Sequence, residues 1–486
     1  MRVYDKLIVG LRAYTSVRLL TQILSWCGTI YVVRHLGSHA IGQYAVALVV
    51  FSFLAMTFDG SLLETLVQRP PSEEERRGVF TLVVGIGLIL ASLAAGLSGM
   101  VARLVGDPAV TPLVIGAAGA FALMSVGVLP QATLARQMAF PRLASIAAAQ
   151  SLFVTITTVI LASLGVGAQA LMWGLIVGAF TRVVFLNIVN PGFAWPTLRI
   201  GSVLGYVRFG GLLFADNLLW RWYTSLDTFL LGRWAGTTSL GYYNLAQQVA
   251  ELPLEKITTV VNDVSLPAYA ELRAQAGGVA QLLLETIRTH AIVGFALFWG
   301  LGAVASYAIP VLFGNHWQPA IFPLVALSTI APWRLIGSSE TPAMTGIGRP
   351  EVLIKTKLII APCMTLALLV ACRFWGIRGA ALAWAIAFPI CHGISFRYVL
   401  RAAQVPYKQV LLVVRGPAGA AALMVGIVLV WERMLGVMSA PPIVVLISAI
   451  GAGAVSYALG LQWIDPEAFH LVRIRFGRFI GVGRST

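Results

Sequence analysis

Long apolar stretches separated by short polar segments make up almost the whole chain. A stretch of about 20 apolar residues is long enough to cross a bilayer as a helix, and the pattern predicts fourteen such spans. The predicted spans cover residues 16–33, 40–65, 79–101, 110–130, 143–163, 168–187, 209–231, 238–264, 289–312, 318–338, 352–372, 376–396, 410–432 and 440–462. Before the third span, Ser72 and Glu75 have the spacing of a capping box, which predicts a helix start there.

The composition changes this picture little, because it also indicates a membrane protein. Apolar residues make up 58% of the chain and charged residues only 11%, whereas soluble domains carry roughly 25% charged residues. The net charge of +15 comes from basic residues between the apolar stretches, which favours the positive-inside rule over nucleic-acid binding. With alternate loops on opposite sides, one side holds only Arg34, Arg103, Arg233, Arg373, Arg378 and Arg433. Most other basic residues lie on the opposite side, so both termini are expected in the cytoplasm.

Several kinds of chemistry find no support in the sequence. The four cysteines show no CxxC spacing, and His35 and His39 have no third ligand nearby, so no metal site is expected. There is no Walker A, GxSxG, HExxH or CxxCH motif, and no removable signal peptide is expected. A membrane-embedded polymerase or ligase would need a substantial catalytic outer loop, but no predicted outer loop exceeds roughly a dozen residues. We therefore expect no catalytic residue and no bound cofactor.

A repeated motif divides the chain into two similar halves. Arg34, Gly37, Gly42 and Tyr44 recur with the same spacing 199 residues later, in the pattern R-x-x-G-x-x-x-x-[I/L]-G-x-Y. The second copy consists of Arg233, Gly236, Gly241 and Tyr243. A weaker echo, Gly165…Ala170-Leu171-x-Trp173, returns as Gly376…Ala381-Leu382-x-Trp384. The repeated glycines are expected to allow a tight turn between paired helices.

The duplication predicts an all-α polytopic membrane protein of two six-helix lobes. Six spans per copy send both copies into the membrane in the same direction, related by a pseudo-twofold axis along the membrane normal. The predicted N-terminal lobe covers residues 1–200, the C-terminal lobe 201–405, and an additional helix pair 406–463. Residues 464–486 form a basic tail with apolar residues at helical spacing, which is typical of a helix on an anionic membrane surface.

Polar residues within the spans gather in spans 1, 2, 7 and 8, which also carry the repeated motif. In span 8, spacings of four and three residues place one polar stripe on one helix face. The stripe consists of Asn244, Gln248, Glu251, Glu255, Thr258 and Asn262. Because a charged side chain in the bilayer core is costly, the stripe is expected to line a hydrated cavity. Polar packing against a neighbouring helix, or a helix largely outside the membrane, are the alternatives.

Other charged residues in the spans have two interpretations each. Arg221 in span 7 either pairs with Glu251 or Glu255 or contacts a substrate. Arg18 in span 1 either extends to the interface or points into the cavity. Arg334 and Glu340 could pair with each other across the last turns of span 10.

A coupling ion, H+ or Na+, would need a carboxylate in the same region. The candidates for such ion coupling are Asp216, Asp227, Glu251 and Glu255. The sequence alone does not separate ion binding from structural pairing at these positions. Since such carboxylates could also couple drug export to a cation, a cation-coupled multidrug exporter on the same scaffold is an alternative function.

Several segments resemble one known family. The stretches VVRHLGSHAIGQYAVA and FDGSLLETLVQRP resemble the opening of the polysaccharide transporter family. SLDTFLLGRWAGTTSLGYYNLAQQVAELPLEKI is similar to that family's D-x-x-x-L-G-R-x-x-G-x-x-x-L-G-x-Y segment, and LFGNHWQPA and GIGRPEV are similar to later pieces. The family comprises Wzx-type lipid-linked oligosaccharide flippases of the multidrug/oligosaccharidyl-lipid/polysaccharide (MOP) flippase superfamily. The resemblance covers most of the chain and weakens after about residue 405.

The resemblance implies a function and a set of partners. A flippase of this kind moves undecaprenyl-pyrophosphate-linked oligosaccharide across the bacterial inner membrane by alternating access, for exopolysaccharide, capsule or O-antigen assembly. Helices 1, 2, 7 and 8 would line the cavity, and the last two spans would offer a groove for the polyprenyl tail. Arg18 and Arg221 are the candidates for binding the anionic headgroup, and Asn244, Gln248, Glu251, Glu255 and Asn262 for binding sugars. Membrane lipids and the polymerase and export proteins of the pathway are the implied partners.

Overall fold

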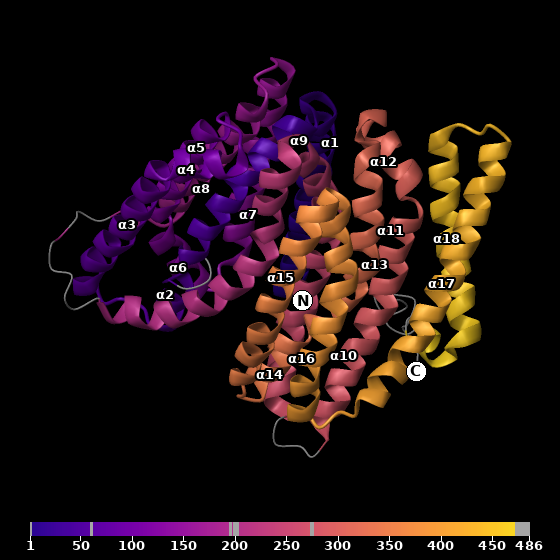
Figure 1. The fold of residues 1–486 in the computed structure, drawn as a ribbon. Helices are drawn as coiled ribbons and strands as arrows, with labels where there is room; N and C mark the ends of the chain where they lie inside the picture. Colours follow the sequence, from indigo (N-terminus) through magenta and orange to yellow (C-terminus); the bar gives the residue numbers. More distant parts are fainter. Residues whose placement is uncertain (1, 59–61, 194–196, 198–203, 273–276, 472–486) are drawn as a thin grey trace. The chain divides into compact units, whose positions relative to one another are not determined.

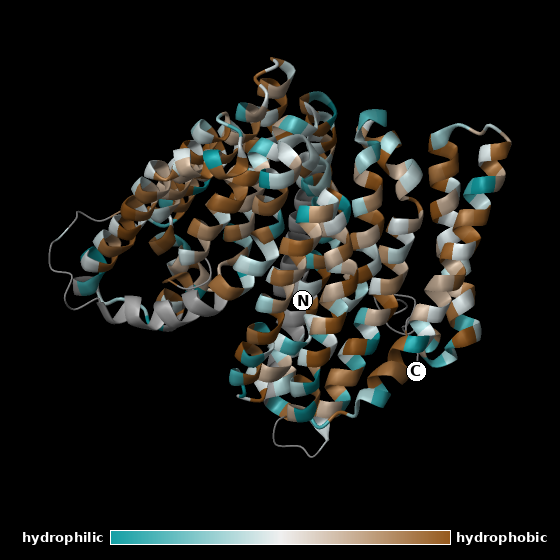
Figure 2. Cartoon of the chain, viewed as in Figure 1, coloured by the Kyte–Doolittle hydropathy of each residue, from teal (hydrophilic) through white to brown (hydrophobic). Residues whose placement is uncertain are grey.

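The computed structural model describes residues 2–58, 62–193, 197, 204–272 and 277–471, and every regular element in these ranges is a helix (Figure 1). The chain forms two compact units, Met1–Gly241 and Tyr242–Thr486. Within the described ranges, nine helices are long and apolar enough to cross a membrane. A tenth is counted if the bent pair α5 (Val110–Ser125) and α6 (Val128–Arg136) forms one span. Apolar residues dominate the long helices (Figure 2), so the chain is a multi-pass, all-helical membrane protein as predicted.

Glycine interrupts three of the long helices. α1 (Arg2–Thr57) breaks at Gly37, α9 (Leu204–Leu272) breaks at Gly236, and α15 (Glu351–Leu382) breaks at Gly376. At 1.5 Å per residue, α1 would be ~84 Å long as one straight helix, far more than the ~30 Å hydrocarbon core. α1 and α9 therefore each contain two of the predicted spans. The total of fourteen spans stays a prediction.

The repeated glycines adopt matching conformations in the two copies. Gly37 has φ 73° and ψ 169°, and Gly236 has φ 80° and ψ 162°. This region of backbone space is accessible essentially only to glycine. In the weaker echo, Gly165 and Gly376 also have positive φ, at 75° and 53°. The predicted tight turns are confirmed, and the duplication is visible in the backbone as well as in the sequence.

The first unit contains α1 to α8 and the part of α9 that ends at Gly241. Besides α5 and α6, its shorter helices are α2 (Leu63–Gln68), α3 (Glu73–Gly96), α4 (Ser98–Val105), α7 (Phe140–Ser163) and α8 (Ala168–Val189). Its core includes Phe58 and Phe121, whose rings stack with centroids 4.7 Å apart. At the start of α3, the Ser72 hydroxyl accepts from the Glu75 N–H at 3.2 Å, and the Glu75 carboxylate accepts from the Ser72 N–H at 3.1 Å. The predicted capping box is therefore confirmed.

The second unit contains the rest of α9 and the helices that follow it. They are α10 (Gly278–Gly294), α11 (Gly300–Ala303), α12 (Ala305–Phe313), α13 (Ile321–Gly337), α14 (Glu340–Gly346), α15, α16 (Phe388–Ala402), α17 (Tyr407–Val437) and α18 (Pro442–Ile464). Short π-helical segments join α10 to α11 and α15 to α16, and a 3-10 segment, η4 (Asn315–Ala320), precedes α13. The units divide inside α9, whereas the predicted lobes divide at residue 200, and the lobe boundaries stay a prediction.

The additional helix pair is α17 and α18, which pack on α10 and α12 in the second unit. Arg288 on α10 forms ion pairs with Asp465 at 2.7 Å and with Glu467 at 3.2 Å, just after α18. The Tyr457 hydroxyl donates to the Ile292 carbonyl at 2.7 Å. These contacts attach the pair to the second unit at the end where the chain leaves α18. Most of the predicted amphipathic tail, residues 472–486, lies outside the described residues.

Candidate functional site

The predicted polar stripe lies on the part of α9 that follows the break at Gly236. Asn244 is buried and accepts a hydrogen bond from the Gln248 side chain at 2.7 Å. Further along the stripe, Gln248, Glu251 and Thr258 are half-buried, and Glu255 is exposed. The side chain of Asn262 lies outside the described residues. The carboxylates are therefore accessible and are not sealed within dry helix contacts.

Glu251 has a cationic partner within the second unit. Its carboxylate lies 3.1 Å from the Arg334 guanidinium on α13, and the Gln247 side chain donates to it at 3.4 Å. The Arg334 guanidinium also lies over the Trp384 ring, 5.0 Å from the ring centroid, a favourable cation–π geometry. The Glu251–Arg334 ion pair thus connects the stripe to α13. Arg334 belongs to the candidate site, although the sequence predicted that it pairs with Glu340.

The expected pair between Arg334 and Glu340 is wrong. Arg334 pairs with Glu251, whereas the Glu340 carboxylate lies 2.8 Å from the His392 Nε2 on α16. The expectation assumed one continuous helix, but α13 ends at Gly337 and α14 begins at Glu340. Residues six apart in a helix also do not face each other, unlike those three or four apart, and each of the two meets a partner from another helix.

The charged residues of span 7 lie in the first unit. Asp227 is fully buried, and its carboxylate accepts from the Thr228 N–H at 2.8 Å. Arg221 lies over the neighbouring Trp220 ring at 5.0 Å. The side chains of Arg18 and Asp216 lie outside the described residues. The substrate and ion roles of these four residues stay predictions.

A polar cluster next to the repeated turns was missed by the sequence analysis. Asp107 follows α4, and its carboxylate accepts from the Gln43 side chain at 2.9 Å and from the Thr237 hydroxyl at 3.1 Å. Thr237 also contacts His39 Nδ1 at 2.9 Å. The cluster joins both repeated turns to the turn after α4. One signal in the sequence was available, because Ser38 and Thr237 are hydroxyl residues at the same position of the two motif copies.

The surroundings of Asp107 favour its charged form. Its side chain is only 15% exposed, and this burial raises the pKa of the carboxyl. Hydrogen bonds from the Gln43 side chain, the Ala109 N–H and the Thr237 hydroxyl, with His39 close by, lower the pKa further than burial raises it. The net result is a pKa below the usual carboxylate value, so Asp107 is an anion at neutral pH.

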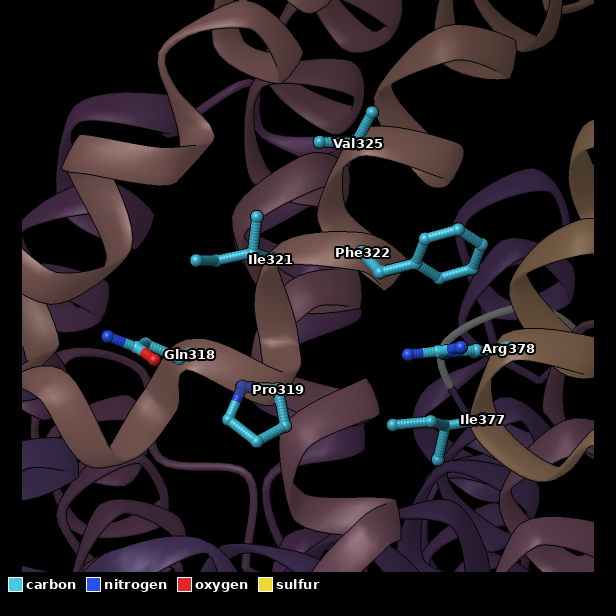
Figure 3. A pocket seen from close by; sticks show the side chains of 7 residues that line it. All are labelled: Gln318, Pro319, Ile321, Phe322, Val325, Ile377 and Arg378. Atoms are coloured by element: carbon cyan, nitrogen blue, oxygen red, sulfur yellow. The ribbon is translucent and has the colours of Figure 1, made fainter.

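A separate pocket of about 430 Å³ lies between α13 and α15 (Figure 3). Figure 3 shows that Gln318, Pro319, Ile321, Phe322 and Val325 come from η4 and α13, while Ile377 and Arg378 come from α15. The Arg378 guanidinium lies 5.7 Å from the centroid of the Phe322 ring. None of the predicted site residues lines this pocket, so it is distinct from the stripe.

The duplicated helices, their matching breaks and the polar stripe define the scaffold of a membrane transporter. Residues 31–322, more than half of the chain, match the family described as "Polysaccharide biosynthesis protein". The chain belongs to this family. The matched region includes both copies of the repeated motif and the whole polar stripe.

Two proteins of polysaccharide biosynthesis are similar in sequence to this chain, one over part of its length and the other over most of it. The chain is 25% identical over 308 residues to "Lipopolysaccharide biosynthesis protein WzxC" of Escherichia coli (strain K12), a match that spans 63% of each chain. It is 26% identical over 436 residues to "Succinoglycan biosynthesis transport protein ExoT" of Rhizobium meliloti (strain 1021). The second match covers 88% of this chain and 86% of ExoT.

The fold is that of a solved flippase. The structure described as "Lipid II flippase MurJ, inward closed conformation" superimposes with a TM-score of 0.75. The superposition covers 93% of this chain and 98% of MurJ at 15% sequence identity. At this identity the likeness establishes the fold and leaves the substrate open.

Proposed function

We propose that this protein is a flippase for polyprenyl-pyrophosphate-linked oligosaccharide, and not an enzyme. It would move undecaprenyl-linked repeat units across the bacterial inner membrane, with both termini in the cytoplasm, for exopolysaccharide, capsule or O-antigen assembly. The observation that carries the proposal is the polar stripe of α9, which sits directly after one of two matching helix breaks. A helix with accessible amides and carboxylates suits a hydrated path for sugars in an otherwise apolar protein.

Each group of residues has a role in this proposal. Arg18 and Arg221 would attract the anionic pyrophosphate, because guanidinium groups bind phosphate oxygens well. Gln248, Glu251 and Glu255 would hydrogen-bond sugar hydroxyls along the stripe. The paired lobes would open to the two sides of the membrane in turn.

The named relatives support a transported glycan rather than a drug. ExoT is called a transport protein of succinoglycan biosynthesis, and WzxC a lipopolysaccharide biosynthesis protein. Both names concern glycans. Polymerase and export proteins of the same pathway would then be partners of this protein.

A genetic experiment tests the proposal. A strain that lacks the gene should accumulate lipid-linked oligosaccharide and lose polymer, and the wild-type gene should restore both. The Glu251→Ala/Glu255→Ala variant should restore less polymer than the wild-type gene at equal protein level. Normal polymer from that variant would remove the role of the stripe. Hypersensitivity of the deletion strain to cationic drugs, with normal polymer, would instead favour the exporter.

A further inference from the structure

Glu340 and His392 form a buried acid–base pair that the proposed transport path does not use. Glu340 begins α14 and is 9% exposed, while His392 lies on α16 and is 12% exposed. The carboxylate Oε1 and the imidazole Nε2 are 2.8 Å apart. A Cβ atom on Gly337 would lie 2.7 Å from the same nitrogen, so the glycine leaves room for the imidazole.

Neighbouring rings fix the position of the imidazole. Phe388 and Phe396, one helical turn before and after His392, stack on its ring with centroids 5.3 and 5.4 Å away. Interplanar angles of 18° and 21° show nearly parallel rings. The ring is thus held with Nε2 2.8 Å from the carboxylate oxygen.

The elements packed around the pair carry other titratable groups, including Lys355 and Lys357 on α15 and Arg397 and Arg401 on α16. On α10, fully buried His290 contacts the Ser339 hydroxyl at 2.8 Å, next to Glu340 in the chain. On α13, Arg334 is paired with Glu251. Cys391 precedes His392 on α16 and interacts with Cys363 on α15. In the part of the chain that the structure describes, no Lys or Arg forms an ion pair with Glu340.

We propose that Glu340 and His392 together bind one exchangeable proton. With a neutral imidazole and a carboxylate, the pair carries one negative charge in a site shielded from water, which is costly. One added proton gives either imidazolium with carboxylate or imidazole with carboxylic acid, and both are neutral overall. Histidine is the side chain best suited to exchange a proton between about pH 5 and 8.

The pair is also connected to the stripe through packed side chains. The Phe388 ring lies between His392 and Trp384, with the Trp384 centroid 5.5 Å away. Arg334 lies over Trp384 and is paired with Glu251. A change in the His392 ring on protonation would therefore reach Glu251 through direct contacts within the second unit. This coupling of the proton to transport rests on the proposed function, whereas proton binding does not.

Proton counting on the purified full-length protein tests the binding site. Between pH 8 and 5, Glu340→Gln should take up about one proton fewer than wild type, because the remaining imidazole has no anion to pair with when protonated. The Glu340→Gln/His392→Gln double variant should lose the same single proton and no more, because the pair shares one proton. Glu351→Gln, an exposed carboxylate at the start of α15, should match wild type. Equal uptake by wild type and both folded variants would overturn the proposal.

A second measurement covers the case in which the variants misfold. Infrared difference spectra of the wild-type protein between pH 8 and 5 should show protonation of a water-shielded carboxyl or imidazole group. A spectrum without such a change would also overturn the proposal. In vesicles, an imposed pH gradient should accelerate oligosaccharide flipping by wild type but not by the two variants. If the protons are counted as expected but nothing is flipped, the proton site stands and the proposed function fails.

Discussion

The backbone of Gly42 packs directly against the backbone of Thr237. A Cβ atom on Gly42 would overlap the Thr237 carbonyl oxygen, and one on Gly241 would overlap the Ser38 carbonyl oxygen. Gly241 follows Gly42, and Thr237 follows Ser38, by the same 199 residues. The two contacts are therefore copies of each other, related by the same shift in sequence as the repeated motif.

Alanine at Gly42 or Gly241 should destabilise the protein. The added methyl group has no space, so the two backbones must separate, at a cost of about 1–3 kcal/mol. Thermal unfolding in detergent measures the effect. Gly85→Ala is the matched control, because a Cβ atom there meets nothing within 4 Å. Unfolding temperatures of the Gly42 and Gly241 variants equal to the control's would contradict the close contact.

Alanine at Gly37 or Gly236 should destabilise the protein for a different reason. A Cβ atom at Gly37 or Gly236 meets nothing within 4 Å, but the backbone lies in a region that costs a residue with a side chain about 1–3 kcal/mol. The two variants should lose similar stability, since the two turns match. Gly96→Ala, in open space without a positive φ, serves as the control. A loss at one position only would show that the turns are not equivalent.

The stability contributed by Asp107 should depend on pH. Its pKa is lower in the folded protein, so the charged carboxylate stabilises the fold above the unfolded-state pKa of about 3.9 and loses this effect as the pH falls through the folded-state value. Asp107→Asn should cost roughly 1–3 kcal/mol at pH 7. The difference from wild type should shrink as the pH falls below about 4. Denaturant unfolding at several pH values measures this, and a difference independent of pH would contradict the assignment.

Glu251 and Arg334 should be energetically coupled. Removing either partner leaves a half-buried charge without its partner. The double variant Glu251→Ala/Arg334→Ala should therefore lose less unfolding free energy than the sum of the losses of the two single variants. We expect a coupling of about 1 kcal/mol in a double-mutant cycle of unfolding free energies. Glu351→Ala combined with Arg334→Ala should be additive. Additivity in the Glu251 cycle would show that the ion pair contributes nothing.

Features that depend on local sequence were predictable. The apolar stretches predicted a membrane bundle, the Ser72–Glu75 spacing predicted a helix start, and the repeated glycines predicted turns. Each of these depends on residues close together in the chain. The number of spans is harder to assign, because in α1 and α9 two helical segments are separated by only a single non-helical glycine.

Features that depend on partners distant in sequence were not predictable. Asp107 meets Gln43 and Thr237, which are 64 and 130 residues away. Glu340 meets His392, which is 52 residues away, rather than Arg334, which is six residues away and does not share its helix face. Neither partner choice is encoded in a spacing within one helix. Such pairs follow from packing between helices, which hydrophobic periodicity does not specify.

The most direct test of the proposed function uses vesicles that contain only the purified protein and a labelled undecaprenyl-pyrophosphate-linked oligosaccharide. Access of an added glycan-modifying enzyme to the label measures how much substrate has crossed. The account predicts that label becomes accessible from the opposite leaflet only when the protein is present, and more slowly with Glu251→Ala/Glu255→Ala. Label that stays on its original side with folded wild-type protein, under imposed gradients of H+ and Na+, would contradict it.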